Sequence, residues 1–200
     1  MSLLPYLEFN RLEAGCDEVG RGCLCGPVVA AAVILPNDFA NDFINDSKKL
    51  TKGSREELVA IIKSNALAWA IAQASVEEID RINILEASYL AMNRAVEALQ
   101  HKPQHLLIDG NRFKCQQDIP FDCIVKGDGK YASIAAASIL AKVYRDELMC
   151  RFAIDYPGYG WETNVGYPTA AHRDGIIKMG ITPLHRKSFR LLPEQLELPF

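Results

Sequence analysis

The segment Val28–Leu35 is an almost unbroken run of valine, alanine, isoleucine and leucine, and it is bounded by Pro27 and Pro36. A short apolar run without polar alternation predicts a strand that is buried on both faces. The apolar segment Ala14–Val19 precedes it, and a glycine-rich turn separates the two. Together the two segments predict a hairpin at the centre of a sheet.

Helix-type and strand-type patterns alternate over the rest of the chain. Ser54 and Ser75 each precede a glutamate by three positions, a capping box that predicts the start of a helix. The order of elements predicts an α/β fold with a mixed central sheet flanked by helices and a helical C-terminal extension. The further predicted elements are a strand over Leu67–Ile71, helices over Asn83–Leu99 and Tyr131–Tyr156, strands at His105–Ile108 and Cys123–Val125, and a helix from Thr169 to about Met179.

The composition is that of an ordinary globular protein, with 49% hydrophobic and 24% charged residues, which excludes disordered, collagen-like and coiled-coil classes. A length of 200 residues predicts one domain. No apolar run approaches the ~20 residues that a membrane-spanning helix needs. The N-terminal segment also has neither the basic nor the apolar part of a secretory signal. We therefore expect a monomeric cytoplasmic protein without membrane contact.

The charge and the cysteines exclude further classes of protein. A formal net charge of −3 argues against a protein that coats nucleic acid broadly, since such a protein is strongly basic. The net charge is compatible with an enzyme that binds nucleic acid through one local patch of its surface. The six cysteines contain no C-x-x-C pair, so we expect reduced, mostly buried thiols rather than disulfides or a zinc site.

Four acidic residues stand where predicted strands end or helices begin: Asp17, Glu18, Asp109 and Asp128. Sites collect at strand ends in α/β sheets, and a buried carboxylate is costly unless it is paired or bound to a metal. Oxygen ligands without a histidine or cysteine at the spacing of a zinc site favour Mg²⁺ or Mn²⁺ over zinc. The alternative is structural, because Asp109 can belong to a turn and Asp128 can cap the next helix.

Long motifs in the chain resemble bacterial ribonuclease HII, and they follow the family's order from about residue 14 to about residue 190. One departure is Cys23, which stands where the family usually has proline. The motifs are Asp17-Glu18-Val19-Gly20-Arg21-Gly22 with the apolar run that follows it, Asn45-Asp46-Ser47-Lys48-Lys49-Leu50, Leu107-Ile108-Asp109-Gly110-Asn111, Lys126-Gly127-Asp128 with Ser133–Asp146, Gly166-Tyr167-Pro168-Thr169, and His185-Arg186-Lys187-Ser188-Phe189.

The resemblance implies a ribonuclease H-like fold, with a catalytic domain over residues 1–190 and a tail over residues 191–200. It implies an endonuclease that cuts the RNA strand of RNA–DNA hybrids. It also implies cleavage 5′ of single ribonucleotides in duplex DNA, during DNA replication and repair. Asp17, Glu18 and Asp109 match the family's metal-binding carboxylates, and Asp128 matches its fourth acidic residue. Catalysis would use two divalent ions about 4 Å apart.

The resemblance also assigns substrate contacts. The loop Gly20-Arg21-Gly22 matches one that contacts the ribose 2′-hydroxyl through its backbone, and that hydroxyl distinguishes RNA from DNA. Tyr167 matches a tyrosine that packs on the neighbouring deoxyribose; the alternative is an ordinary surface aromatic. The basic residues that we expect to contact phosphates are Lys48, Lys49, Arg186 and Lys187.

The resemblance assigns no role to His172, His185 or Cys16. We expect His172 and His185 to be surface or helix-capping residues; the alternative is contact with a phosphate. Cys16 would lie in the core, on the face of its strand opposite to Asp17, because successive strand residues point to opposite faces.

The last residues resemble the short peptide by which many bacterial proteins dock on the DNA sliding clamp. Leu196, Leu198 and Phe200 would enter an apolar groove of the clamp as an extended peptide, and Gln195 would fix the register. The alternative is a tail that packs on its own domain.

Two other functions remain open from the sequence. One is a different nuclease with this fold, such as a resolvase or ribonuclease HIII, and the absence of a substrate-binding extension before residue 14 disfavours the latter. The other is an inactive hybrid-binding module tethered to the clamp, which the intact Asp17, Glu18 and Asp109 disfavour.

Overall fold

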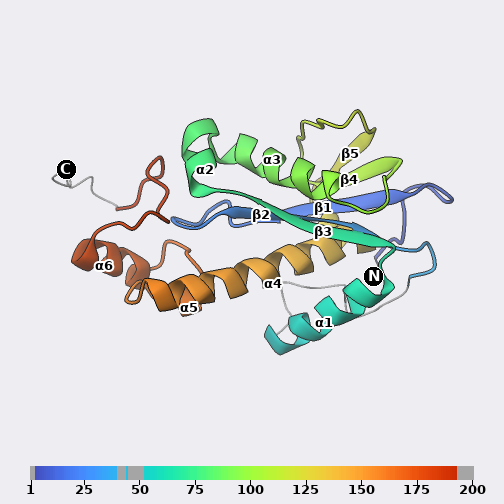
Figure 1. Ribbon diagram of the computed structural model, residues 1–200. Coiled ribbons are helices and arrows are strands. Elements are labelled where there is room, and N and C mark those ends of the chain that lie inside the picture. Colours follow the sequence, from blue (N-terminus) through green and yellow to red (C-terminus); the bar gives the residue numbers. More distant parts are fainter. Residues whose placement is uncertain (1–2, 40–43, 45–51, 193–200) are drawn as a thin grey trace.

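The computed structural model describes residues 3–39, 44 and 52–192. A five-stranded sheet lies between two layers of helices (Figure 1). The strand order is β3-β2-β1-β4-β5, with β2 antiparallel to β1 and β3, and with β4 parallel to β1 and β5. This mixed sheet confirms the predicted fold class. The strands are β1 (Glu13–Val19), β2 (Val28–Ile34), β3 (Ala68–Ala74), β4 (His105–Asp109) and β5 (Phe121–Ile124).

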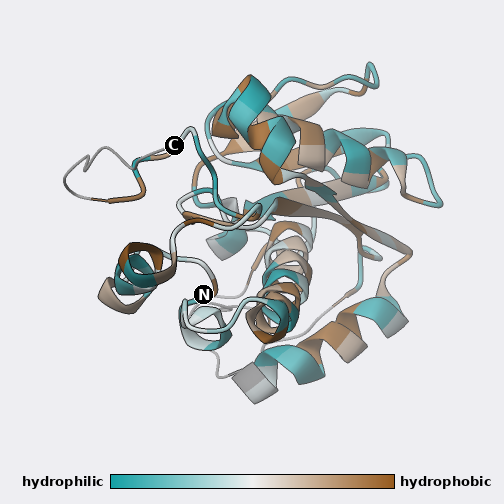
Figure 2. Cartoon of the chain, turned by 60° about the vertical axis from the view of Figure 1, so that its left-hand side comes forward, coloured by the Kyte–Doolittle hydropathy of each residue, from teal (hydrophilic) through white to brown (hydrophobic). Residues whose placement is uncertain are grey.

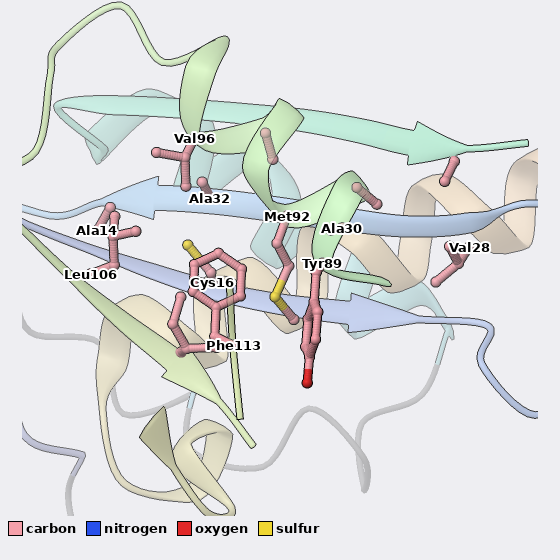
Figure 3. Close-up of a cluster of buried hydrophobic side chains, with 14 of the residues drawn as sticks. Ala14, Cys16, Val28, Ala30, Ala32, Tyr89, Met92, Val96, Leu106 and Phe113 are labelled. Atoms are coloured by element: carbon pink, nitrogen blue, oxygen red, sulfur yellow. The ribbon is translucent and has the colours of Figure 1, made fainter. Parts of the chain in front are cut away.

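Strand β2 is buried along its whole length, as its sequence predicts. Its even-numbered residues face helix α3 (Ile84–Glu97) and share a core cluster with Cys16 and Met92 (Figure 3). Its odd-numbered residues face helices α1 (Lys52–Asn65) and α4 (Ala132–Asp155). The strand is apolar without alternation because helices cover both of its faces.

The helices turn their polar sides outward. In Figure 2 the sheet is mostly brown, and teal residues lie on the outer side of the helices that cover it. A pattern of this kind is expected of helices that bury one stripe against a sheet. None of the helices within the described residues is long and apolar enough to cross a membrane.

The two predicted capping boxes have different outcomes. Ser75 caps helix α2 (Val76–Ile82), and its hydroxyl accepts from Glu78 N at 3.2 Å while Glu78 Oε2 accepts from Ser75 N at 2.9 Å. The prediction for Ser54 is wrong, because α1 already begins at Lys52. Tertiary burial of the apolar face sets the limits of a helix more strongly than a local cap motif does.

The C-terminal extension packs against the second half of α4. It contains α5 (Trp161–Asn164) and α6 (Ala170–Met179). Their apolar residues form a separate core cluster with Met149 of α4. As predicted, the Thr169 hydroxyl caps α6 by accepting from His172 N at 3.3 Å, and Gly180 follows the helix with φ of 78°. This separate apolar cluster therefore holds the extension against α4.

Strand β1 approaches α4 more closely than a side chain would allow. A Cβ on Gly15 would lie 2.2 Å from the backbone carbonyl carbon of Ser133. Only glycine leaves the space that this approach needs. The contact brings the first turns of α4 over the end of β1, where the acidic residues begin.

We predict that Gly15→Ala lowers the free energy of unfolding by about 1–3 kcal/mol, because the added methyl group overpacks a backbone contact. Urea unfolding measures the change. Gly53→Ala is the matched control, since Gly53 lies in α1 with nothing within 4 Å of its Cβ position. We expect the control to be neutral or to stabilise by up to about 1 kcal/mol. Equal losses in the two variants would contradict the prediction.

Candidate active site

The sheet register places two predicted acidic residues side by side. Strands β1 and β4 are parallel, and their last pair in register is Cys16 with Ile108. Asp17 and Asp109 are the next residues on the two strands. The carboxyl ends of parallel strands meet at one edge of a sheet, which is where sites form in α/β folds. The hairpin and the β4 strand therefore bring Asp17 and Asp109 together from distant parts of the sequence.

Asp17 is almost completely buried, with 7% of its surface exposed. Its Oδ1 accepts from Glu18 N at 2.7 Å, and the hydroxyl of Ser138 on α4 bonds the same carboxyl group. Burial raises the pKa of Asp17 well above its ordinary value, and the negative charges of Glu18 and Asp109 raise it further. The site thus concentrates negative charge where water is largely excluded.

The other two carboxylates are held by neighbouring groups. Asp109 Oδ1 accepts from Gly127 N at 2.7 Å. Glu18 Oε1 forms an ion pair with Arg21 Nη1 at 3.0 Å. Burial raises the pKa of Glu18, whereas the positive charge of Arg21 acts in the opposite direction.

All three carboxylates line one cavity of about 430 Å³. The predicted loop Gly20-Arg21-Gly22 and the side chain of Tyr167 line it too. A second cavity of about 200 Å³ lies between Glu18, Asp109 and α3, and Arg112 is part of its lining. Seven of the ten predicted site residues that the structure describes therefore line one space.

The same cavity has lining residues that the sequence analysis did not identify: Arg55, Ser138 and Lys142. Ser138 and Lys142 stand four positions apart on α4, so they share one face of that helix. A signal was present in the sequence, because polar residues at this spacing interrupt an alanine-rich helix.

The donor set fits a hard divalent cation. Asp17, Glu18 and Asp109 line the cavity, and a cation would offset the burial and the repulsion that raise the pKa of Asp17. Within the described residues, no three histidine, cysteine, aspartate or glutamate side chains are already gathered closely enough to hold a metal ion. Arg21 supplies part of the positive charge beside Glu18 instead.

Several predicted site residues lie outside this cavity. Asp128 lies in the 3₁₀ helix η2 (Gly127–Gly129), next to the amide that bonds Asp109, but it does not line the cavity. Lys187 is exposed, and its backbone N–H donates to Asp80 at 3.0 Å. The predictions for Lys48, Lys49 and the tail residues Gln195, Leu196, Leu198 and Phe200 fall outside the described residues.

The prediction that Arg186 contacts phosphate is wrong. Its side chain is completely buried, and it donates to backbone carbonyls, including that of Gly20 at 2.7 Å. A guanidinium group can satisfy several carbonyls at once because its donors form a planar fork. Such a role depends on residues far away in the chain, and the motif alone does not reveal it.

The prediction for the two histidines is also wrong, since both are completely buried. His172 Nε2 accepts from Trp161 Nε1 at 2.9 Å, so His172 Nδ1 carries the proton and donates to the carbonyl of Tyr167 at 3.0 Å. His185 Nδ1 accepts from Thr182 N at 2.9 Å, so its Nε2 carries the proton. This Nε2 lies 3.2 Å from His172 Nε2, whose single lone pair it shares with Trp161 Nε1. This chain of hydrogen bonds requires both rings to be neutral.

Half of the cysteines are buried, and the prediction that Cys16 lies in the core is confirmed. All six thiols are free, and Cys16, Cys23 and Cys25 are buried. Cys16 lies in the core beneath α3 (Figure 3), on the opposite side of β1 from the cavity.

Comparison with known proteins decides the family. The ribonuclease HII family profile matches residues 14–192. The chain belongs to the ribonuclease HII family. A curated ribonuclease HII from Parabacteroides distasonis is 62% identical over 198 residues, covering 99% of this chain and 100% of that protein. This ribonuclease HII is therefore a ribonuclease H, an endonuclease that acts on RNA–DNA hybrids, and the resolvase and ribonuclease HIII alternatives are not supported.

Solved structures agree with this ribonuclease HII assignment. The ribonuclease H2 of Pyrococcus horikoshii OT3 is 25% identical, with a TM-score of 0.75 and coverage of 90% of this chain and 94% of that one. The ribonuclease HII in a complex with PCNA from Archaeoglobus fulgidus is 26% identical, with a TM-score of 0.73 and coverage of 88% and 92%. The ribonuclease H-like fold is thus confirmed.

We predict that the buried histidine pair makes this ribonuclease HII less stable as the pH falls from 7.5 to 5. Burial lowers the pKa of His185 from 6.5 to about 4, so in this window the unfolded chain takes up a proton that the folded chain does not. The contribution of His185 to the free energy of unfolding is complete above pH 6.5 and declines towards pH 4. His185→Gln should flatten the decline, as measured by the melting temperature at several pH values.

The control is His101→Gln, because His101 is exposed. This variant should lose stability with falling pH as steeply as the parent protein. An unchanged slope in His185→Gln would show that the buried pair does not cause the loss.

Proposed function

We propose that this ribonuclease HII uses divalent metal ions to cut duplex DNA on the 5′ side of a single embedded ribonucleotide, as well as the RNA strand of hybrids. The observation that carries the proposal is the joint lining of one cavity. Asp17, Glu18 and Asp109 border it together with the loop Gly20-Arg21-Gly22 and Tyr167. Hydrolysis and recognition of the sugar can therefore take place in the same space.

The loop and the tyrosine suit recognition of an RNA–DNA junction. Gly20 has φ of 95°, and Arg21 and Gly22 are exposed beside the cavity. The two glycines on either side of Arg21 have no Cβ, which lets backbone groups approach a ribose 2′-hydroxyl, the group that distinguishes RNA from DNA. Tyr167 is 39% exposed, so its ring can pack on the sugar of the next nucleotide.

Metal binding would use the carboxylates of Asp17, Glu18 and Asp109, with Asp128 as a fourth acidic residue. Their oxygens suit Mg²⁺ or Mn²⁺. Held by these residues, a pair of such ions would supply activation of a water molecule and stabilisation of the negative charge on the leaving 3′ oxygen. Glu18 would exchange its ion pair with Arg21 for this role, which releases Arg21 towards the substrate backbone.

Basic residues at the cavity would hold the phosphates. Arg55 and Lys142 line it directly, and Lys187 is exposed on the extension. Contacts of this type position a duplex without reading its sequence. Lys48 and Lys49 belong to the same proposal on sequence grounds alone. Cleavage at embedded ribonucleotides would serve DNA replication and repair.

We predict that Asp109→Asn keeps substrate affinity within a few-fold and lowers kcat by about a thousandfold, or ~4 kcal/mol of barrier. The substituted amide oxygen can still accept from Gly127 N, so the fold is preserved, but the charge that attracts a cation is lost. A fluorogenic duplex with one ribonucleotide, assayed with and without Mg²⁺, measures the effect.

Asp122→Asn is the matched control. Asp122 lies on the adjacent strand β5 and bonds His105, away from the cavity. It should cleave like the parent protein. Wild-type turnover by Asp109→Asn would refute the site assignment. An all-DNA duplex and a long hybrid complete the test, since equal inactivity on the all-DNA and single-ribonucleotide duplexes would refute the proposed substrate.

We also propose that residues 195–200 dock on the DNA sliding clamp. The support is the sequence of the tail, with Gln195 and the apolar residues Leu196, Leu198 and Phe200, together with the relative in complex with PCNA. Alternate apolar side chains of an extended peptide can enter pockets of a groove.

We predict that deletion of residues 195–200 abolishes clamp binding and leaves hydrolysis of a short free duplex unchanged. Surface plasmon resonance with the bacterial clamp measures the first effect, and the fluorogenic assay measures the second. Leu196→Ala with Phe200→Ala should reproduce the deletion if the apolar anchors provide the affinity. Clamp affinity that survives the deletion would end this proposal.

A further inference from the structure

Two arginine side chains lie completely buried next to the proposed substrate loop. Arg145 on α4 and Arg186 in the extension both have no exposed surface. Neither takes part in an ion pair with a carboxylate among the described residues. Burial of a charge is costly unless its donors are satisfied. The acceptors that these two guanidinium groups bind must therefore stabilise them.

Arg186 binds the inner side of the loop. Its Nη2 donates to the carbonyl of Gly20 at 2.7 Å, and its Nη1 donates to the carbonyl of Arg21 at 3.0 Å. Its Nε and Nη2 also donate to Gly26 at 3.0 and 2.9 Å. One side chain therefore fixes two successive peptide groups of the loop and the residue where the loop returns to β2.

Arg145 connects the loop to the segment that carries the tyrosine. It donates to the carbonyl of Cys25 at 3.0 Å and to that of Val165 at 2.7 Å. The thiol of Cys23 donates to the same Val165 carbonyl at 3.8 Å. A Cβ on Gly20 would lie 2.2 Å from Arg145 Nε, so the loop also rests directly on this side chain.

The direction of these carbonyls fixes the direction of the amides. The peptide group is planar and trans, so its N–H points away from its C=O. The carbonyls of Gly20 and Arg21 point inward to Arg186, and the amides of Arg21 and Gly22 in the same peptide groups therefore point to the opposite side. Arg21 and Gly22 are exposed there and line the cavity.

We propose that Arg186 and Arg145 are positioning residues for ribose recognition. Arg186 holds two loop carbonyls inward so that the amides of Arg21 and Gly22 face the substrate 2′-hydroxyl. Arg145 keeps this loop at a fixed distance from the Tyr167 segment. The inference rests on the proposed function, because it concerns how the same cavity recognises an embedded ribonucleotide.

The charge of Arg186 persists at neutral pH. Burial and the positive charge of Arg145 lower the pKa of Arg186 to about 10, which still leaves it protonated. Lysine in its place would keep the charge but could not bind several carbonyls with a planar fork. Arg186→Lys therefore tests whether the loop depends on the planar fork of hydrogen-bond donors or only on the positive charge.

The test measures binding in the Asp109→Asn background, where the duplex is not cut. The readout is the ratio of Kd for an all-DNA duplex to Kd for the same duplex with one ribonucleotide. Arg186→Lys should lower this ratio by about tenfold, the loss expected for one hydrogen bond. Arg145→Lys should lower the Kd ratio as well. If one of the two variants fails to fold, the other still tests the proposal.

Two control variants distinguish positioning from general destabilisation. Arg94→Lys alters an arginine that binds Glu78 and Gln73 away from the cavity. Ile79→Ala removes a fully buried side chain on the α3 side of the sheet and should lower the melting temperature as much as Arg186→Lys does. Both controls should keep the parental ratio.

Each other outcome overturns a defined statement. If the Asp109→Asn protein binds both duplexes equally, so that its Kd ratio is one, the proposed substrate is refuted and the inference loses its basis. If the Asp109→Asn protein prefers the duplex with a ribonucleotide, and Arg186→Lys and Arg145→Lys keep that preference, the inference is overturned. The proposed function then stands. An equal fall of the ratio in Ile79→Ala overturns the inference too, because loss of stability would then explain the effect.

Discussion

The parallel pairing of β1 with β4 is the constraint on which the rest of the molecule depends. It joins strands that are distant in the chain, and its register ends immediately before Asp17 and Asp109. Helix α4 can then cross the end of β1 only because Gly15 has no side chain, and this contact brings Ser138 to Asp17. The acidic site is thus a result of backbone pairing and close packing rather than of any local motif.

The distribution of charge around the cavity follows from the same arrangement. The carboxylates repel one another, and burial adds to the cost of their ionisation. The same cavity is also lined by the positive groups Arg21, Arg55 and Lys142, and Arg145 and Arg186 are buried beneath the loop. The lining cations would partly neutralise a polyanionic strand in this cavity and so let it approach the carboxylates.

The sequence predicts those parts of the protein that depend on neighbouring residues. The apolar run of β2, the strand ends at Asp17 and Asp109, and the cap at Ser75 each carry their signal within a few positions. Arg186 and His172 were assigned to the wrong environment because their partners, the Gly20 carbonyl and the Trp161 indole, come from other parts of the fold. Burial of a polar side chain depends on such partners, and one sequence does not show them.

The C-terminal extension carries most of what surrounds the substrate loop, whereas the sheet carries the acids. Tyr167, His172 and Arg186 all follow α4, and the extension rests on its own apolar cluster around Trp161. In the proposed function, recognition of the sugar would therefore depend partly on the extension, whereas the carboxylates depend on the sheet. If that function holds, we expect sequence change within the extension to alter which sugars are accepted while the carboxylates stay in place.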